Sequence, residues 1–84
     1  MSISFITFRS VTFAQRGEEL LRKNGIFCIL QRTPKWMEKQ GCGYCLRLRQ
    51  KDYEQAATLL RQHQVLFRKV YLRDDSGEIK EVPL

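Results

Sequence analysis

The sequence has few of the features that mark a membrane, secreted or zinc-binding protein. No apolar run approaches the roughly 20 residues that a membrane-spanning helix needs. The first residues, MSISFITFRS, lack the charged start and long apolar stretch of a signal peptide. The chain has one histidine, His63, and one Cys-x-x-Cys pair, which supply too few ligands for a tetrahedral zinc site. We therefore expect a reduced, cytoplasmic protein that binds no metal and does not associate with membranes.

The composition is typical of one small basic domain. The 84 residues are 43% hydrophobic and 29% charged, with a net charge of +6 and an isoelectric point near 9.6. This is enough apolar material for one modest core. We expect one domain over residues 1–75, followed by a turn and a short strand or tail over residues 76–84. The positive charge favours anionic partners, whether nucleic acid, an acidic protein surface or a small anion, without choosing among them.

Four segments have the apolar pattern of β-strands, and two intervening segments have the pattern of helices. The strands are expected at residues 4–9, 26–32, 44–50 and 65–73. The order β-α-β-β-α-β predicts an α+β, ferredoxin-like fold, in which two helices cover one face of a four-stranded antiparallel sheet with strand order 4-1-3-2. The terminal EIKEVPL forms either an additional edge strand or a tail. An exposed edge strand could also pair across a homodimer.

The two helices carry their own start and stop signals. Each is expected to open with a capping box, formed by Thr12 with Gln15 and by Asp52 with Gln55. The small residues Ala14 and Gly17 would let the first helix lie close to the sheet. At its end, Gly25 fits the left-handed position after the cap, and Ile26 completes a Schellman arrangement.

The stretch QGCGYCLR places Cys42 in the loop between the second and third strands. In the predicted topology this loop lies at the end of the sheet where the first strand ends and the first helix begins. We therefore expect Arg9, Ser10 and the positive end of the helix dipole near Cys42. Such surroundings lower a thiol pKa from its usual value near ~8.5, which predicts a reactive thiolate. Gly41 and Gly43 would leave its sulfur uncrowded.

The other two cysteines have different expected roles. Cys45 begins the third strand, where it either forms a disulfide with Cys42 or points to one face of the sheet. Cys28, in the apolar run IFCIL, is expected to be a buried hydrophobic residue. Thioredoxin-type pairs open a helix, whereas the strand pattern LRLRQ follows this pair. A dithiol redox protein that uses Cys42 and Cys45 stays open as an alternative.

A second alternative is a basic module that binds nucleic acid or protein. The RNA-recognition motif has the same predicted topology, with glycines and stacking rings on its third strand. In this chain Gly41, Gly43 and Tyr44 match that pattern, but only Tyr44 could stack on a base. A phosphate-binding surface would use Arg47, Arg49, Arg68 and Arg73.

Several segments together resemble a known family of small bacterial proteins. These segments are FITFRSVTFA, EELLRKNGI and TPKWMEKQGCGYCLRL, followed by a helix and a strand. Over roughly residues 4–73 they are similar to the selenium/sulfur carrier-like family, formerly a domain of unknown function. The most specific matches are Phe8, Ser10, Pro34-Lys35 and Cys42-Gly43. The chain departs from the family at Lys35, where arginine is usual, and at Cys45, where a small residue is usual.

The resemblance implies a carrier or adaptor rather than an enzyme. Cys42 would hold a sulfane sulfur or selenium as a transient persulfide or selenosulfide, with no other cofactor, and pass it to an acceptor protein. A protein of the cysteine desulfurase type could be the donor. Lys35, Ser10 and the start of the first helix would stabilise the negative terminal atom. The departure at Cys45 raises the possibility of a carrier that is switched by a disulfide.

Overall fold

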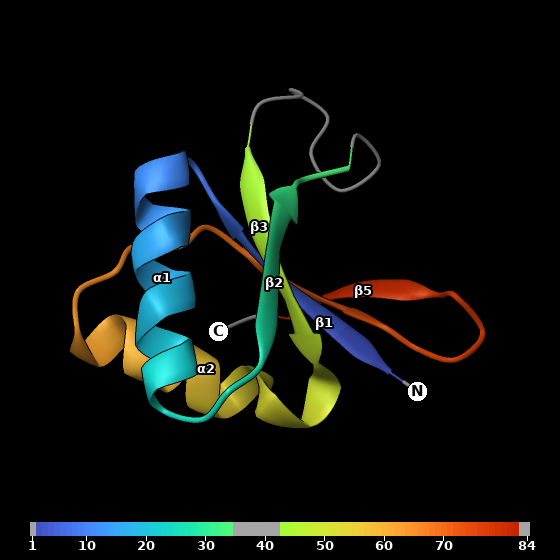
Figure 1. The fold of residues 1–84 in the computed structure, drawn as a ribbon. Coiled ribbons are helices and arrows are strands. Elements are labelled where there is room, and N and C mark those ends of the chain that lie inside the picture. The colour runs from blue at the N-terminus through green and yellow to red at the C-terminus, as the bar shows by residue number, and fades with distance from the viewer. Residues whose placement is uncertain (1, 35–42, 83–84) are drawn as a thin grey trace.

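The structure is a computed structural model that describes residues 2–34 and 43–82. These residues form an antiparallel sheet and two α-helices (Figure 1). The strands are β1 (Ile3–Phe8), β2 (Cys28–Arg32), β3 (Tyr44–Arg49), β4 (Val70–Arg73) and β5 (Ile79–Val82). The helices are α1 (Val11–Lys23) and α2 (Tyr53–Gln62), and a 3₁₀ turn, η1 (Gln50–Asp52), leads into α2.

The sheet is antiparallel throughout and has the strand order β2-β3-β1-β4-β5. The predicted α+β class is confirmed. The number of strands is five rather than four, because β5 pairs with β4 from Val70↔Val82 to Arg73↔Ile79 and extends that edge. The terminal segment is therefore the additional edge strand, not a tail, over the residues that the structure describes.

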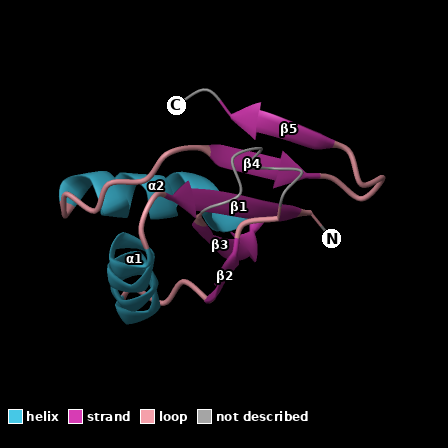
Figure 2. Cartoon of the chain, turned by 90° about the horizontal axis from the view of Figure 1, so that it is seen from above, coloured by secondary structure: helices cyan, strands magenta, loops and turns pink. Residues whose placement is uncertain are grey.

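Both helices contribute to one core on a single face of the sheet (Figure 2). On this face Ile6 and Leu46 pack with Ala14 of α1 and Leu60 of α2, and all four are fully buried. The helices mainly contact β1, β2 and β3, while β5 lies farthest from them (Figures 1 and 2). No helix among residues 2–34 and 43–82 has the length and apolar character that crossing a membrane requires.

The helices begin differently from the prediction. Ser10 caps α1, because its hydroxyl oxygen accepts a hydrogen bond from the Phe13 N–H at 3.2 Å. The capping box predicted at Thr12 is therefore wrong, since Thr12 already lies inside the helix. Asp52 does precede α2, but its carboxylate contacts Arg49 at 3.4 Å and makes no capping hydrogen bond. The 3₁₀ turn occupies the residues where an extended cap would have to lie.

The end of α1 agrees with the predicted Schellman arrangement. Gly25 has φ +79°, in the left-handed region that favours glycine. Its N–H donates to the Arg22 carbonyl at 3.1 Å, and the Ile26 N–H donates to the Leu21 carbonyl at 2.9 Å. Leu21 and Ile26 are both buried in the helix-side core. The turn therefore leads the chain directly into β2.

The strand predicted at residues 65–73 is shorter than expected, and β4 begins at Val70. Regular pairing with β1 ends at a bulge opposite Thr7. The Thr7 N–H donates to the Lys69 carbonyl at 2.8 Å, while the Arg68 N–H donates to the Thr7 carbonyl at 2.7 Å. The Thr7 hydroxyl accepts from the Lys69 N–H at 3.1 Å. Two residues thus oppose one, an arrangement that turns a strand away from its neighbour.

Candidate functional site

The loop identified in the sequence lies only partly within the described residues. Lys35, Gly41 and Cys42 lie outside them. The two described ends of the loop are joined by the sheet, because the Thr33 N–H donates to the Gly43 carbonyl at 3.0 Å. This bond continues the β2–β3 pairing by one step. The residue that follows Cys42 is therefore held at the end of the ladder.

Arg9 and Ser10 lie at this same end of the sheet. Phe8, the last residue of β1, pairs with Tyr44, the first residue of β3. Arg9 and Ser10 directly follow Phe8, so they are close to the point where the loop enters β3. Arg9 is exposed and Ser10 is half-buried. The Ser10 oxygen accepts the Phe13 N–H, which leaves the hydroxyl hydrogen free to donate to another group.

Cys45 is fully buried on the sheet face opposite the helices. It pairs with Thr7 on β1 and with Gln31 on β2. Burial raises the pKa of the Cys45 thiol above its usual value. Polar contacts with Thr33 and Gln31 and the charge of Arg47 act in the opposite direction but are smaller. The neutral thiol is therefore the favoured form of Cys45 in this structure.

Thr33 is a polar neighbour of this thiol that the sequence did not point to. Its hydroxyl oxygen is buried without a well-aligned hydrogen-bond partner. The Thr33 hydroxyl lowers the pKa of the Cys45 thiol, but by less than burial raises it. A threonine just after a strand carries no sequence signal of its own; only the ladder bond to Gly43 brings it here.

Cys28 is fully buried beneath α1, which confirms the prediction of a buried hydrophobic residue. Its thiol donates weakly to the Glu18 carbonyl, with a sulfur–oxygen distance of 3.9 Å. Burial raises the pKa of this thiol, and the nearby Arg22 guanidinium only partly offsets that effect. Arg22 also donates to the Cys28 carbonyl at 2.8 Å. The residue acts as part of the core.

Basic side chains from three segments lie at the loop end of the sheet. Arg9 follows β1, Arg32 ends β2, and Arg68 and Lys69 form the bulge opposite Thr7. The Arg32 guanidinium lies 6.0 Å from the centre of the Tyr44 ring, within the range of a cation–π contact. The contribution of Lys69 was missed in the sequence, because the bulge that places it there has no local signature.

Tyr44 does not support the nucleic-acid alternative. Its side chain packs against the helix-side core, on the same face as Leu46. The alternation of β3 places Arg47 and Arg49 on the opposite face, with Cys45. The ring that would stack on a base is therefore separated from the arginines that would bind phosphate. One surface that uses Tyr44 together with Arg47 and Arg49 is therefore not formed on β3, and phosphate binding by the arginines alone stays a prediction.

Comparisons with known proteins give one match. A family model described as "Putative Se/S carrier protein-like" matches residues 4–72. This range runs from β1 into β4 and includes the loop that carries Cys42. No curated protein and no solved structure matches the chain. Within residues 2–34 and 43–82, no three His, Cys, Asp or Glu side chains are grouped so that they could hold a metal ion.

Proposed function

The chain belongs to the Se/S carrier protein-like family, and on this basis we propose that it carries a sulfane sulfur or a selenium atom on Cys42. The family match over residues 4–72 is the observation that carries the proposal. The cargo would come from a persulfide-bearing donor protein of the cysteine desulfurase type. It would leave to an acceptor protein in a reduced, cytoplasmic setting.

The surroundings of the other two cysteines support Cys42 as the carrier. Cys28 and Cys45 are both fully buried, and burial raises the pKa of each thiol. A neutral, inaccessible thiol is a poor nucleophile, because the thiolate is the reactive form. Cys42 is the remaining cysteine of the chain.

The transfer step balances without an added oxidant. The Cys42 thiolate attacks the terminal sulfur of the donor's persulfide, and a new sulfur–sulfur bond forms at Cys42. The donor's own sulfur–sulfur bond breaks, and its cysteine leaves as a thiolate. The terminal sulfur keeps its proton, so Cys42 becomes a persulfide without a general base. Selenium would follow the same path as a selenosulfide.

When the terminal sulfur then loses its proton to solvent, the resulting anion needs stabilisation, and the loop end of the sheet offers suitable groups. Arg9 is exposed there, and the Ser10 hydroxyl has a hydrogen to donate at the start of α1. We include Lys35 and the loop glycines Gly41 and Gly43 in the same proposal. Cations and helix N-termini favour an anion in this way in many proteins.

Cys45 would act on the cargo only after a change in its surroundings. A disulfide with Cys42 would release a bound sulfur, but a buried neutral thiol attacks slowly. We therefore place Cys45 as a slow resolving residue rather than as half of a dithiol redox pair.

Sulfur loading tests the carrier proposal. The reduced protein is incubated with a cysteine desulfurase and isotopically labelled cysteine, and its intact mass is measured. We expect one added, reductant-labile sulfur on the wild type and none on Cys42→Ser. Cys28→Ala is the matched control, because it removes a thiol from the core without touching the loop, and it should load normally. Loading of Cys42→Ser at the wild-type level would refute the proposal.

A further inference from the structure

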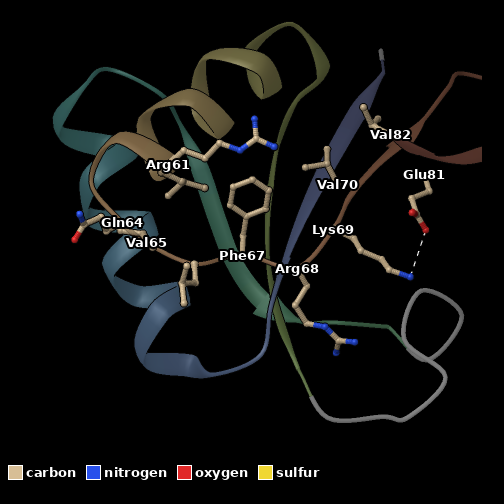
Figure 3. A pocket seen from close by; sticks show the side chains of 11 residues that line it. Arg61, Gln64, Val65, Phe67, Arg68, Lys69, Val70, Glu81 and Val82 are labelled. Atoms are coloured by element: carbon tan, nitrogen blue, oxygen red, sulfur yellow. Dashed lines mark ion pairs between the residues drawn. The ribbon is translucent and has the colours of Figure 1, made fainter. Parts of the chain in front are cut away.

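A groove opens between the end of α2 and the last two strands, on the helix side of the sheet (Figure 3). We call it the α2–β5 groove; its volume is about 580 Å³. It is lined by the end of α2, by the segment at residues 64–69, and by β4 and β5. The groove exists because the helices mainly cover β1, β2 and β3 and leave this edge of the sheet without a helix above it.

The floor of the groove is apolar and firmly packed. Leu60 and Val70 are fully buried, and Val65 is almost so. Phe67 and Val82 are partly buried and pack against the same core. Beside this floor Leu66 is 68% exposed, which is unusual for so large an apolar side chain. An exposed leucine beside an apolar floor is what a hydrophobic docking site requires.

The rim of the groove is mainly positive. The described lining residues include three cations, Arg61, Arg68 and Lys69, and one carboxylate, Glu81. The Arg61 guanidinium lies 5.5 Å from the centre of the Phe67 ring, which holds the charge beside the floor (Figure 3). Lys69 contacts Glu81 at 3.4 Å, but both side chains are about half exposed. Such an exposed pair is weak, so an incoming carboxylate can compete for Lys69.

We infer that the α2–β5 groove binds an acidic segment of a partner protein that inserts an apolar side chain beside Leu66 and Phe67. The apolar floor would take the inserted side chain, and Arg61 and Lys69 would take the carboxylates. This inference stands independently of the cargo on Cys42, because the groove uses none of the loop residues.

Two other kinds of ligand fit the groove less well. A small molecule is usually held in a concave pocket that covers most of its surface, whereas six of the residues lining this groove are exposed. Single-stranded nucleic acid needs open rings on which bases stack. Phe67, the one ring among the described lining residues, is half-buried and already covered by Arg61. An extended peptide matches both the open shape and the aliphatic floor.

Peptide selection tests the inference with the full chain. A library of short random peptides is displayed and selected on the wild-type protein, and enriched peptides are measured by fluorescence anisotropy. We expect enrichment of peptides that combine Asp or Glu with a large apolar residue. The absence of any enriched family, or enrichment of basic peptides, would overturn the inference. Binding should persist in Cys42→Ser, so that a failed carrier proposal leaves this result unchanged.

Two charge reversals locate the binding site. Arg61→Glu should weaken binding roughly tenfold or more, because it places repulsion beside the floor. Arg16→Glu is the matched control: Arg16 also lies over a phenylalanine ring, at 5.9 Å from Phe13, and does not line the groove. Both variants change the net charge equally, so Arg16→Glu should alter affinity by less than about twofold.

A third variant and amide shifts complete the test. Leu66→Ser, at an exposed position, should also weaken binding and keeps the test valid if Arg61→Glu is unstable. In nuclear magnetic resonance spectra of the wild type, the peptide should shift amides of residues 64–70 and 81–82. Equal losses in Arg61→Glu and Arg16→Glu, or shifts confined to another face, would overturn the inference.

Discussion

At the scale of single residues, Gly17 decides how closely α1 approaches the sheet. A Cβ atom at this position would lie 3.1 Å from Phe8 Cζ, 3.2 Å from Leu60 Cδ2 and 3.4 Å from Leu46 Cδ1. All three neighbours are fully buried, so none can move into open space. The sequence predicted this close approach from the small residues on one face of the helix, and the structure confirms it.

Gly17→Ala tests that contact. Alanine would gain about 1 kcal/mol of helix propensity, but overpacking a closed core costs roughly 1–3 kcal/mol. We expect the overpacking to prevail and the free energy of unfolding to fall, as measured by urea denaturation. Gln15→Ala, at an exposed position of the same helix, should change stability by less than about 0.5 kcal/mol. A Gly17→Ala protein more stable than wild type would show that Phe8, Leu60 and Leu46 can move to accommodate the added methyl group.

The cysteines show what a single residue's sequence context can and cannot predict. Cys28 lies in a nearly continuous apolar run, which correctly predicts its own burial, although the other residues of β2 are half-buried or exposed. Cys45 alternates with Arg47 and Arg49, which correctly assigns the three to one face. That pattern does not show how deeply each is covered: Cys45 is fully buried and Arg49 is exposed. The depth of burial depends on packing against other segments, and the local alternation of residue types carries no information about that packing.

At the scale of elements, helix ends were predicted well where glycine was present and poorly where it was not. The end of α1 has Gly25, which is a specific signal for the left-handed conformation. The end of α2 has the same hydrogen bonds, with the Val65 N–H donating to the Leu60 carbonyl at 2.8 Å. Its left-handed residue is Gln64, with φ +59°. Nothing in a glutamine indicates that conformation, so this turn was invisible in the sequence.

Exchanging residue types at the two turns tests this comparison. Gln64→Gly should raise the free energy of unfolding by about 0.5–1 kcal/mol, because glycine adopts a positive φ without a Cβ clash. Gly25→Ala should lower it by roughly 1 kcal/mol. An added Cβ at Gly25 meets nothing within 4 Å, so this loss would report backbone strain alone.

Thermal and urea unfolding of both variants provide the measurement. Gly25→Ala is the control, because the two turns have the same hydrogen bonds and the free energy of unfolding should change in the opposite direction. The groove inference makes Gln64 a lining residue, so the stability measurements are made without peptide. If Gln64→Gly destabilised the protein, side-chain contacts of Gln64 would have to outweigh the strain.

At the scale of the whole molecule, the order of elements predicted the α+β architecture. The strands β4 and β5 at one edge of the sheet were predicted less well. Residues 65–69 were predicted as part of a strand, yet regular pairing begins only at Val70, because the Gln64 turn and the bulge at Thr7 redirect the chain. The bulge depends on hydrogen bonds to a distant segment, and the Gln64 turn has local hydrogen bonds but no glycine to indicate it. The fifth strand was an open alternative, since a short polar segment pairs only when a turn returns it to a partner. Asp74 provides that turn, accepting the N–H groups of Ser76 and Glu78 at 3.0 Å.

The stability of the whole fold should depend on the two buried thiols at alkaline pH. Burial raises the pKa of Cys28 and of Cys45 above the ordinary value of an exposed thiol. As the pH rises above that value, the unfolded chain loses these protons first, so the native state binds more protons than the unfolded state. The free energy of unfolding must then fall with increasing pH until the native thiols also ionise. Below the ordinary value the two thiols cause no pH dependence.

Urea denaturation at a series of pH values, under reducing conditions, measures this effect. All proteins carry Cys42→Ser, so that only the buried thiols differ and no disulfide with Cys45 can form. We expect the decline between about pH 8 and pH 10.5 to be shallower in Cys28→Ala/Cys45→Ala than in the parent. Tyrosines and lysines titrate equally in both proteins and cancel in the comparison. Parallel declines would mean that the thiols ionise as easily in the folded protein as in the unfolded chain, and the burial of both sulfurs would then be incorrect.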